Sequence, residues 1–391
     1  MRQLVITTFI PILICINSVN AQNIIRIHEK SNDKIAYSQI FQSAKLVKLE
    51  TSPECLIGGI GTLKVDGDHL FAYDNRQETL FVFTIDGHFI AKIGTKGKGP
   101  GEMVNPAGFT LNRSKKQIEI LDTGTKRILV FDYSGKYIKT NRSVWVRGFE
   151  KLSETNYIGY SYNGPFYSDD YAIGPMVLGI FNSQGRILKV FEGIRTIPGS
   201  ISVVTHSNLF LSKDRNAYVV PIFQHGLFRI DTALNLVKVC DFVFDTKIPA
   251  DHLLESTDFE AAVRDNSKKG YPGLISGIKV VNENLSFCYD YNRDMYCAFG
   301  KLSSNNTISV KRTNFLNDLA LFETRFFVGS WDEGLIDIIE ALDFKEEYKK
   351  VIQADKNLSI IKQPGIKDSI LDLVKATNEN DNPILIFYEY K

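Results

Sequence analysis

The feature that most constrains this chain is an internal repeat, in which two segments match without gaps at a spacing of 48 residues. The matched segments are Leu70–Asp74 with Ile118–Asp122, Leu80–Phe83 with Ile128–Phe131, and Gly87 with Gly135. Each copy contains short apolar runs with a two-residue alternation, and Asp-Gly or Ser-Gly precedes the last run. This pattern predicts three strands per copy, of which the last two are joined by a glycine hairpin.

Weaker copies of the same hairpin continue through the rest of the 391 residues. They lie at Phe181–Val190, Tyr218–Phe242 and Leu285–Phe299, and a further copy begins at Phe326–Ser330. A period of about 40 to 50 residues with several strands per unit is typical of a β-propeller, whose blades bury their faces against neighbouring blades. A β-sandwich is the alternative, although it does not repeat its hairpins so regularly.

A glycine-rich segment between the two strongest copies carries a family resemblance. Ile93–Glu102, followed by Asn105 and Pro106, resembles the linker between blades in NHL repeats. The chain as a whole is similar to the six-bladed propellers of NHL type that are abundant among secreted bacterial proteins, strongly over residues 44–140 and faintly beyond. The resemblance implies an all-β, six-bladed propeller, and it implies little about chemistry because many such proteins have no established activity.

The two ends of the chain are expected to close the ring. With the strands of a blade named a to d from the channel outward, Ala44–Glu50 precedes the first a strand and is therefore a d strand. Asn382–Lys391 ends the chain as a c strand without a d strand. We expect these two strands to pair within blade six, which removes an exposed sheet edge.

Strand direction determines which loops share a face. The d–a linkers and b–c loops emerge on one side, which we call the linker face, and the a–b and c–d turns emerge on the other, the turn face. The longer loops belong to the linker face, including two insertions at about 246–276 and 331–382. Helices are predicted after Ile248-Pro249, at Gly334–Leu342 and at Ile366–Ala376. These helices either frame a binding site or merely cap the ring.

The first 21 residues have the pattern of a secretory signal peptide, so the propeller is expected to span residues 22–391. Arg2 precedes an apolar run from Leu4 to Ile16, and Val19 and Ala21 occupy the positions that a signal peptidase reads. Ile14 stands before Cys15 where lipoprotein processing needs a small residue, which favours soluble export to the periplasm or cell surface over lipid anchoring. No later segment is long and apolar enough to span a bilayer.

Composition and motif searches exclude several classes of partner and chemistry. With 46 basic and 45 acidic side chains, the net charge of +1 predicts no general attraction to nucleic acid or anionic lipid. The six histidines lack the spacing of a metal site, and neither a Gly-x-Ser-x-Gly motif nor a P-loop is present. We therefore expect no metal and no cofactor, and no catalytic residue can be assigned.

The candidate ligand-binding residues are aromatic, arginine and histidine side chains assigned to the linker-face mouth of the channel. They are Trp145, Arg147, Tyr162, Phe166, Tyr167, His206, His225, Tyr291, Arg293 and Trp331. Aromatic rings stack on sugars, and arginine binds carboxylates in a bidentate way. The preferred function is therefore an exported module that binds a glycan, a peptide or a small anion. A hydrolase or lyase with its site at the same mouth, or a structural partner in a cell-surface complex, remains an alternative.

Two further pairs of residues are expected to be structural. Asp74 and Asp122 occupy matching strand ends, where an aspartate normally accepts backbone hydrogen bonds. Aligning Tyr289 with Tyr73 places Cys288 opposite Cys297 on a hairpin, where the two residues form either a disulfide or a pair of buried thiols.

Overall fold

The structure is a computed structural model, and it describes part of the chain. The described residues are 23–161, 165–167, 172–175, 178–191, 209–212, 216–221, 224–248, 259–322, 327–355, 358–363 and 365–391. The predicted signal peptide at 1–21, Tyr162, His206 and the predicted helix start after Pro249 lie outside these residues. Of Phe166 and Tyr167 only the backbone is described.

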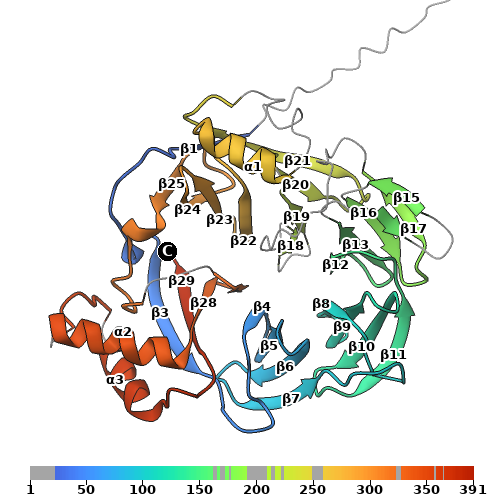
Figure 1. Cartoon of the computed structure of the whole chain (residues 1–391), viewed down its shortest axis with the longest axis horizontal. Helices are drawn as coiled ribbons and strands as arrows, with labels where there is room; N and C mark the ends of the chain where they lie inside the picture. Colours follow the sequence, from blue (N-terminus) through green and yellow to red (C-terminus); the bar gives the residue numbers. More distant parts are fainter. Residues whose placement is uncertain are drawn as a thin grey trace, which may run out of the picture.

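Six antiparallel sheets are arranged in a ring around a channel (Figure 1). Blade 1 consists of β4 (Ile60–Asp66), β5 (His69–Asp74), β6 (Thr79–Thr84) and β7 (Phe89–Ile93). Blade 2 consists of β8 (Pro106–Asn112), β9 (Gln117–Asp122), β10 (Arg127–Asp132) and β11 (Tyr137–Arg142). Blade 3 consists of β12 (Gly148–Lys151), β13 (Asn156–Tyr160), β16 (Leu178–Asn182) and β17 (Ile187–Val190). A hairpin of β14 (Pro165–Tyr167) and β15 (Ala172–Pro175) lies between β13 and β16 in the chain.

The second half of the ring follows the same order. Blade 4 consists of β18 (Leu209–Leu211), β19 (Ala217–Val219), β20 (Gly226–Ile230) and β21 (Leu236–Phe244). Blade 5 consists of β22 (Ile275–Val281), β23 (Asn284–Tyr291), β24 (Asp294–Lys301) and β25 (Thr307–Lys311). Blade 6 consists of β27 (Gly329–Trp331), β28 (Gly334–Ile339), β29 (Ile384–Tyr390) and β3 (Phe41–Lys48). The six-bladed, all-β architecture is therefore confirmed.

The position of each strand in its blade follows from its hydrophobicity. Five of the six residues of β5 and of β9 are buried, because a b strand is covered by a neighbouring blade on each face. In β11, an outermost strand, no residue is buried, and its sequence contains Lys, Thr, Asn and Arg. The hairpin glycines Gly87 and Gly135 adopt φ of +91° and +84°, which a residue with a side chain rarely adopts.

The repeated aspartates fasten the linkers to the blades, as expected. Asp74 is fully buried and accepts hydrogen bonds from the backbone N–H groups of Gly58, Arg76 and Gln77. Asp122 is also fully buried, and it accepts the N–H groups of Val104 and Asn105 in the preceding linker. Each carboxylate therefore fixes the end of a b strand to the linker that enters its blade.

The predicted ring closure is confirmed by the register of blade 6. β29 pairs antiparallel with β3, and Ile386 lies opposite Leu46. Nearer the N-terminus, β1 (Ile24–Ile27) pairs in parallel with β21 and adds a fifth strand to blade 4. The N-terminal segment therefore extends blade 4 at its outer edge and supplies the outermost strand of blade 6.

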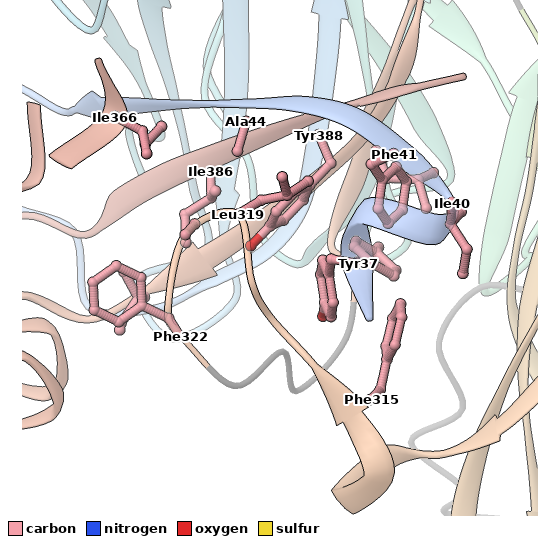
Figure 2. Close-up of a cluster of buried hydrophobic side chains, with 14 of the residues drawn as sticks. Tyr37, Ile40, Phe41, Ala44, Phe315, Leu319, Phe322, Ile366, Ile386 and Tyr388 are labelled. Atoms are coloured by element: carbon pink, nitrogen blue, oxygen red, sulfur yellow. The ribbon is translucent and has the colours of Figure 1, made fainter. Parts of the chain in front are cut away.

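Between these two contacts the N-terminal segment is fixed by aromatic packing. β2 (Ile35–Ala36) pairs in parallel with β26 (Phe315–Leu316), and the single turn η1 (Tyr37–Gln39) follows; a second such turn, η2 (Arg312–Asn314), precedes β26. The Tyr37 ring stacks on Phe315 with 3.9 Å between centroids and lies 5.1 Å from the ring of Tyr388. Figure 2 shows these rings at the junction between the two chain ends.

Among the described residues, three helices lie in the two predicted insertions, and one helix prediction is wrong. α1 (Phe259–Lys268) follows blade 4, whereas α2 (Ala341–Ala354) and α3 (Ile366–Ala376) separate β28 from β29. The helix expected at Ile366–Ala376 is confirmed. The helix expected at Gly334–Leu342 is instead strand β28 followed by the start of α2, because its apolar run is buried as a b strand.

The pair α2–α3 lies beside the outermost strand of blade 6, outside the ring (Figure 1). The side-chain amide of Gln363, just before α3, donates to the carbonyl of Ala44 at 2.9 Å and accepts its N–H at 2.6 Å. Lys48 also donates to the carbonyl of Ala376 at the end of α3. The insertion therefore covers an edge strand that would otherwise be open to pairing with another chain.

Candidate functional site

Five of the candidate ligand-binding residues lie at the linker face, distributed over three blades. Trp145 and Arg147 lie in the linker that enters β12, where Trp145 is half-buried and Arg147 is exposed. His225 precedes β20 and is half-buried. Tyr291 and Arg293 lie at the loop between β23 and β24, where Tyr291 is buried and Arg293 is exposed with φ of +67°.

Packing accounts for two of these side chains. The His225 ring contacts Phe244 edge to face, with 5.0 Å between centroids. Tyr291 contacts Tyr296 in the same way at 6.0 Å. Both partners belong to the hydrophobic core between blades 4 and 5. A ligand-binding role for these residues stays a prediction.

Trp331 lies at the opposite end of the propeller from the position expected. It is the last residue of β27, an a strand, and it leads into an a–b turn on the turn face. The expectation placed it in the b–c loop of blade 6, which begins only after β28. Because strands alternate in direction, an error of one strand moves a residue from one face to the other.

A pocket of about 400 Å³ opens between blades 4 and 5 at the turn face, and we call it the interblade groove. One wall is a row of directly paired residues that crosses blade 4 from the channel outward. The row is Phe210 on β18, Tyr218 on β19, Arg229 on β20 and Val237 on β21. Because paired residues on neighbouring strands point to the same face of a sheet, all four present one surface to blade 5.

Blade 5 and the channel mouth supply the rest of the groove. The opposite wall contains Val280, Val281 and Leu302. At the inner end, Trp331 of blade 6 and Arg113 of blade 2 reach the same pocket. Neutral polar side chains also line it, namely Ser212, Asn216, Asn282 and Ser330. The groove therefore combines apolar surface with hydrogen-bond donors and acceptors.

Two basic groups in this region have no acidic side chain within ion-pair distance among the described residues. The Nε of Arg229 is buried and has no hydrogen-bond partner within that part of the chain. Lys279, on the a strand β22, has its Nζ 5.7 Å from the ring centroid of Phe210 and 3.4 Å from the carbonyl oxygen of Ile278. Burial lowers the pKa of Lys279 to about 8. A desolvated donor without a hydrogen-bond partner, such as Nε of Arg229, costs free energy that an anionic ligand can offset.

Other charged groups near the groove already have partners. Arg113 donates to Asp66 at 3.0 Å, and Lys238 pairs with Asp241 at 2.8 Å. Two exposed carboxylates, Glu283 and Asp332, lie at the lip of the groove. The interior is therefore cationic and the lip is acidic, so a ligand has to place its negative charge at depth.

With this geometry in place, the comparisons with known proteins assign the chain to a family. A family model described as a domain of unknown function, DUF4934, matches residues 22–389. This chain belongs to the DUF4934 family. No curated protein matches it. The family model has no NHL designation, so the resemblance of this DUF4934 chain to NHL repeats stays a prediction.

Solved structures similar to the DUF4934 chain support the fold. A Bacteroides fragilis protein named for its expected export is 20% identical, with a TM-score of 0.73 over 94% of this chain and 99% of that one. A DUF4221 family member from Bacteroides vulgatus is 9% identical, with a TM-score of 0.54 over 90% and 97% of the two chains. At these identities the likeness concerns architecture alone.

Within the described ranges, no helix is long and apolar enough to cross a membrane. The same part of the chain contains no cluster of three or more His, Cys, Asp or Glu side chains that could hold a metal ion.

Sequence reasoning missed most of the interblade groove of the DUF4934 chain. Only Trp331 was among the candidates, and it was assigned to the other face. The signal that could have found Arg229 is its place in the strand Gly226–Ile230, where a charged residue interrupts an otherwise apolar run. A buried strand with one arginine indicates either an ion pair or a ligand.

Proposed function

We propose that this DUF4934 protein is an exported binding module that holds a small acidic saccharide in the interblade groove. The single observation that carries the proposal is Arg229, whose Nε is buried without a hydrogen-bond partner among the described residues and which lines a pocket of about 400 Å³. An arginine fork binds a carboxylate with two parallel hydrogen bonds. The groove volume lies in the range of ordinary small-molecule sites.

The neighbours of Arg229 favour a sugar as the carrier of the carboxylate. Phe210 and Tyr218 precede Arg229 in the row, and Trp331 lies at the inner end. Aromatic side chains favour the C–H faces of sugar rings, while the amides of Asn216 and Asn282 can bind hydroxyl groups. Lys279, near Phe210, adds a second positive charge within reach of the channel end.

Export is supported by the pattern of residues 1–21 and by the fold shared with a protein named for its export. The described chain begins with β1 at Ile24, directly after the expected cleavage position. Removal of the signal peptide would therefore leave β1 intact on blade 4.

Titration calorimetry of residues 22–391 tests the binding proposal. The ligands are glucuronic acid, galacturonic acid and their disaccharides, compared with the neutral sugars glucose and galactose. We expect the acidic sugars to bind and the neutral ones to bind at least tenfold more weakly. Arg229→Gln should reduce affinity for the acidic sugars about 10- to 100-fold, because a charged hydrogen bond contributes about 1.5–3 kcal/mol.

Arg147→Gln is the matched control, since Arg147 is an exposed arginine of the linker face. We expect this variant to bind like the wild type. If Arg147→Gln abolishes binding while Arg229→Gln preserves it, the site lies at the linker face and the groove is not the binding site. If none of the acidic sugars binds, the proposed ligand class is wrong.

A further inference from the structure

Cys288 and Cys297 lie side by side in the core between blades 5 and 6. They occupy neighbouring strands, β23 and β24, and are directly opposite one another in the register. Both are buried, with 6% and 3% of their surface exposed, and their Sγ atoms are 3.6 Å apart. The alignment of this hairpin with the repeat predicted the same juxtaposition.

The turn of this hairpin determines which kind of cross-strand pair the cysteines form. Asn292 and Arg293 both have positive φ, +50° and +67°, as in a two-residue type I′ turn. The residues that close such a turn, Tyr291 and Asp294, form a hydrogen-bonded pair. Hydrogen-bonded and non-hydrogen-bonded pairs then alternate along the ladder, which has no register shift between Tyr291 and Cys288.

By this alternation Cys288 and Cys297 form a non-hydrogen-bonded pair. At such a pair the Cα atoms are about 4.5 Å apart, compared with about 5.5 Å at a hydrogen-bonded pair. Disulfides need Cα atoms about 4.4–6.8 Å apart and Cβ atoms about 3.5–4.5 Å apart. Both Cα spacings fall within the disulfide range, and the Cβ atoms of a non-hydrogen-bonded pair lie closer together, at about 4.5 Å, the upper end of that range. With the Sγ atoms 3.6 Å apart, a small approach of the two strands together with side-chain rotation closes the bond.

We propose that Cys288 and Cys297 form a structural disulfide in the exported protein. This inference depends on the export part of the proposed function, because a disulfide persists in an oxidising compartment. The other two cysteines of the described chain are elsewhere. Cys55 packs between blades 6 and 1 and donates to the carbonyl of Glu50, whereas Cys240 packs between blades 4 and 5.

The oxidation proceeds by thiol–disulfide exchange with a disulfide-bearing oxidant of that compartment. The Cys288 thiolate attacks the disulfide of the oxidant, forms a mixed disulfide and releases one thiolate of the oxidant. The Cys297 thiolate then attacks the Cys288 sulfur, which closes the bond and releases the second thiolate. Two cysteine thiols lose two protons and two electrons, and the oxidant is reduced to a dithiol.

The folded environment indicates when this exchange takes place. A hydrogen bond with Cys288, together with burial, raises the pKa of the Cys297 thiol. Since the thiolate is the reactive form, oxidation is slow once the blades have packed. We therefore expect the bond to form while blade 5 is folding, before blade 6 covers the hairpin.

Thiol trapping in the full chain tests the proposal. The chain is produced with residues 1–21 in a Gram-negative host, the cells are quenched in acid, and free thiols are alkylated under denaturing conditions. We expect the processed protein to carry two alkylated cysteines, Cys55 and Cys240, and a peptide linked through Cys288 and Cys297. Cys288→Ser should raise the number of alkylated cysteines to three, and the double variant C55S/C240S should keep the linked peptide.

A processed chain with four alkylated cysteines would overturn the disulfide while leaving export intact. An unprocessed chain would contradict export, and the pairing is then decided by refolding the reduced residues 22–391 with oxidised and reduced glutathione. In that arm the linked peptide supports the proposal. Four free thiols, glutathione adducts or another pairing overturn it.

Discussion

Lys64 of blade 1 forms an ion pair with Glu150 of blade 3 across the channel. Both residues lie on innermost strands, and Thr110 of the intervening blade donates to the same carboxylate at 2.7 Å. The side chains of Lys64 and Glu150 are only 21% and 10% exposed. This three-blade link is therefore an internal charge network, in which Lys279 of blade 5 is also close enough to interact electrostatically with Lys64 and Glu150.

We expect Glu150→Gln to lower the free energy of unfolding by about 2–4 kcal/mol, because it leaves the Lys64 ammonium largely buried without its counter-ion. Urea denaturation at pH 7 measures the change. The control is Asp86→Asn, which breaks the pair of Lys45 and Asp86, both more than 60% exposed. That variant should differ from the wild type by less than about 0.5 kcal/mol. Equal effects of the two substitutions would contradict an internal network.

Lys279→Met should stabilise the protein at pH 7 by about 1–3 kcal/mol, because the ammonium is desolvated in the folded state. The pKa of Lys279 is about 8 when folded and about 10.4 when unfolded, so the unfolded chain binds more protons between these values. Wild-type stability therefore rises with pH from 8 to 10, and the advantage of the variant narrows.

Urea denaturation of both proteins at pH 7, 8, 9 and 10 measures this convergence for Lys279→Met. If the difference in the free energy of unfolding between the two proteins stays constant with pH, Lys279 does not titrate between pH 8 and pH 10. The same variant should bind acidic sugars more weakly than the wild type at pH 7, since it removes one of the two cations near the groove.

Asp122→Asn is expected to lower the free energy of unfolding by about 1–3 kcal/mol at pH 7. Burial opposes the charge of Asp122, but hydrogen bonds from Thr125, Asn105 and Val104 outweigh burial and lower the pKa. A carboxyl with a lowered pKa stabilises the fold above about pH 4, and this contribution is lost as pH falls through the folded value.

The melting temperature should therefore fall less steeply between pH 7 and pH 2 in Asp122→Asn than in the wild type. Asp68→Asn serves as the control, because Asp68 is exposed in an a–b turn. We expect its pH profile to follow the wild type. Parallel acid profiles for the wild type and Asp122→Asn would contradict the role assigned to this carboxylate.

Ile386→Ala should strongly lower the free energy of unfolding, since Ile386 is 1% exposed in the strand that closes the ring by pairing with β3. We expect a loss of about 2–4 kcal/mol, measured by urea denaturation. Ile138→Ala removes the same atoms from the outermost strand of blade 2, where the residue is 43% exposed. Its effect should stay below about 1 kcal/mol, and a comparable loss in both variants would argue against a special role for the closing pair.

The architecture was predictable wherever the information is local. Gly87 and Gly135 mark hairpins because a positive φ needs glycine, and these two turns fixed the period of the repeat. The pairing of Leu46 with Ile386 then followed from counting strands. The N-terminal strand β1 was not expected, because its partner β21 is more than 200 residues away in the chain and the contact has no local signal.

The failures have equally specific causes. Gly334–Leu342 was assigned to a helix because its apolar residues recur at helical spacing, and over so short a segment this spacing does not distinguish a helix from a buried strand. That error of one strand moved Trp331 to the wrong face. The interblade groove needed the pairing of Tyr218 with Arg229, a register in the weakest copies of the repeat. Without it, Arg229 could not be placed beside an aromatic row.

The shared sixth blade also sets the order in which this polypeptide can acquire its shape. Its outermost strand comes from residues 41–48, whereas the strand beside it comes from Ile384–Tyr390, more than 300 residues later in the chain. Until Ile384–Tyr390 arrive, β3 has no strand to join, and the sheet edge it presents is open. A chain that lacks Ile384–Tyr390 therefore cannot complete blade 6, and for an exported protein we expect the ring to close only after these residues have crossed the membrane.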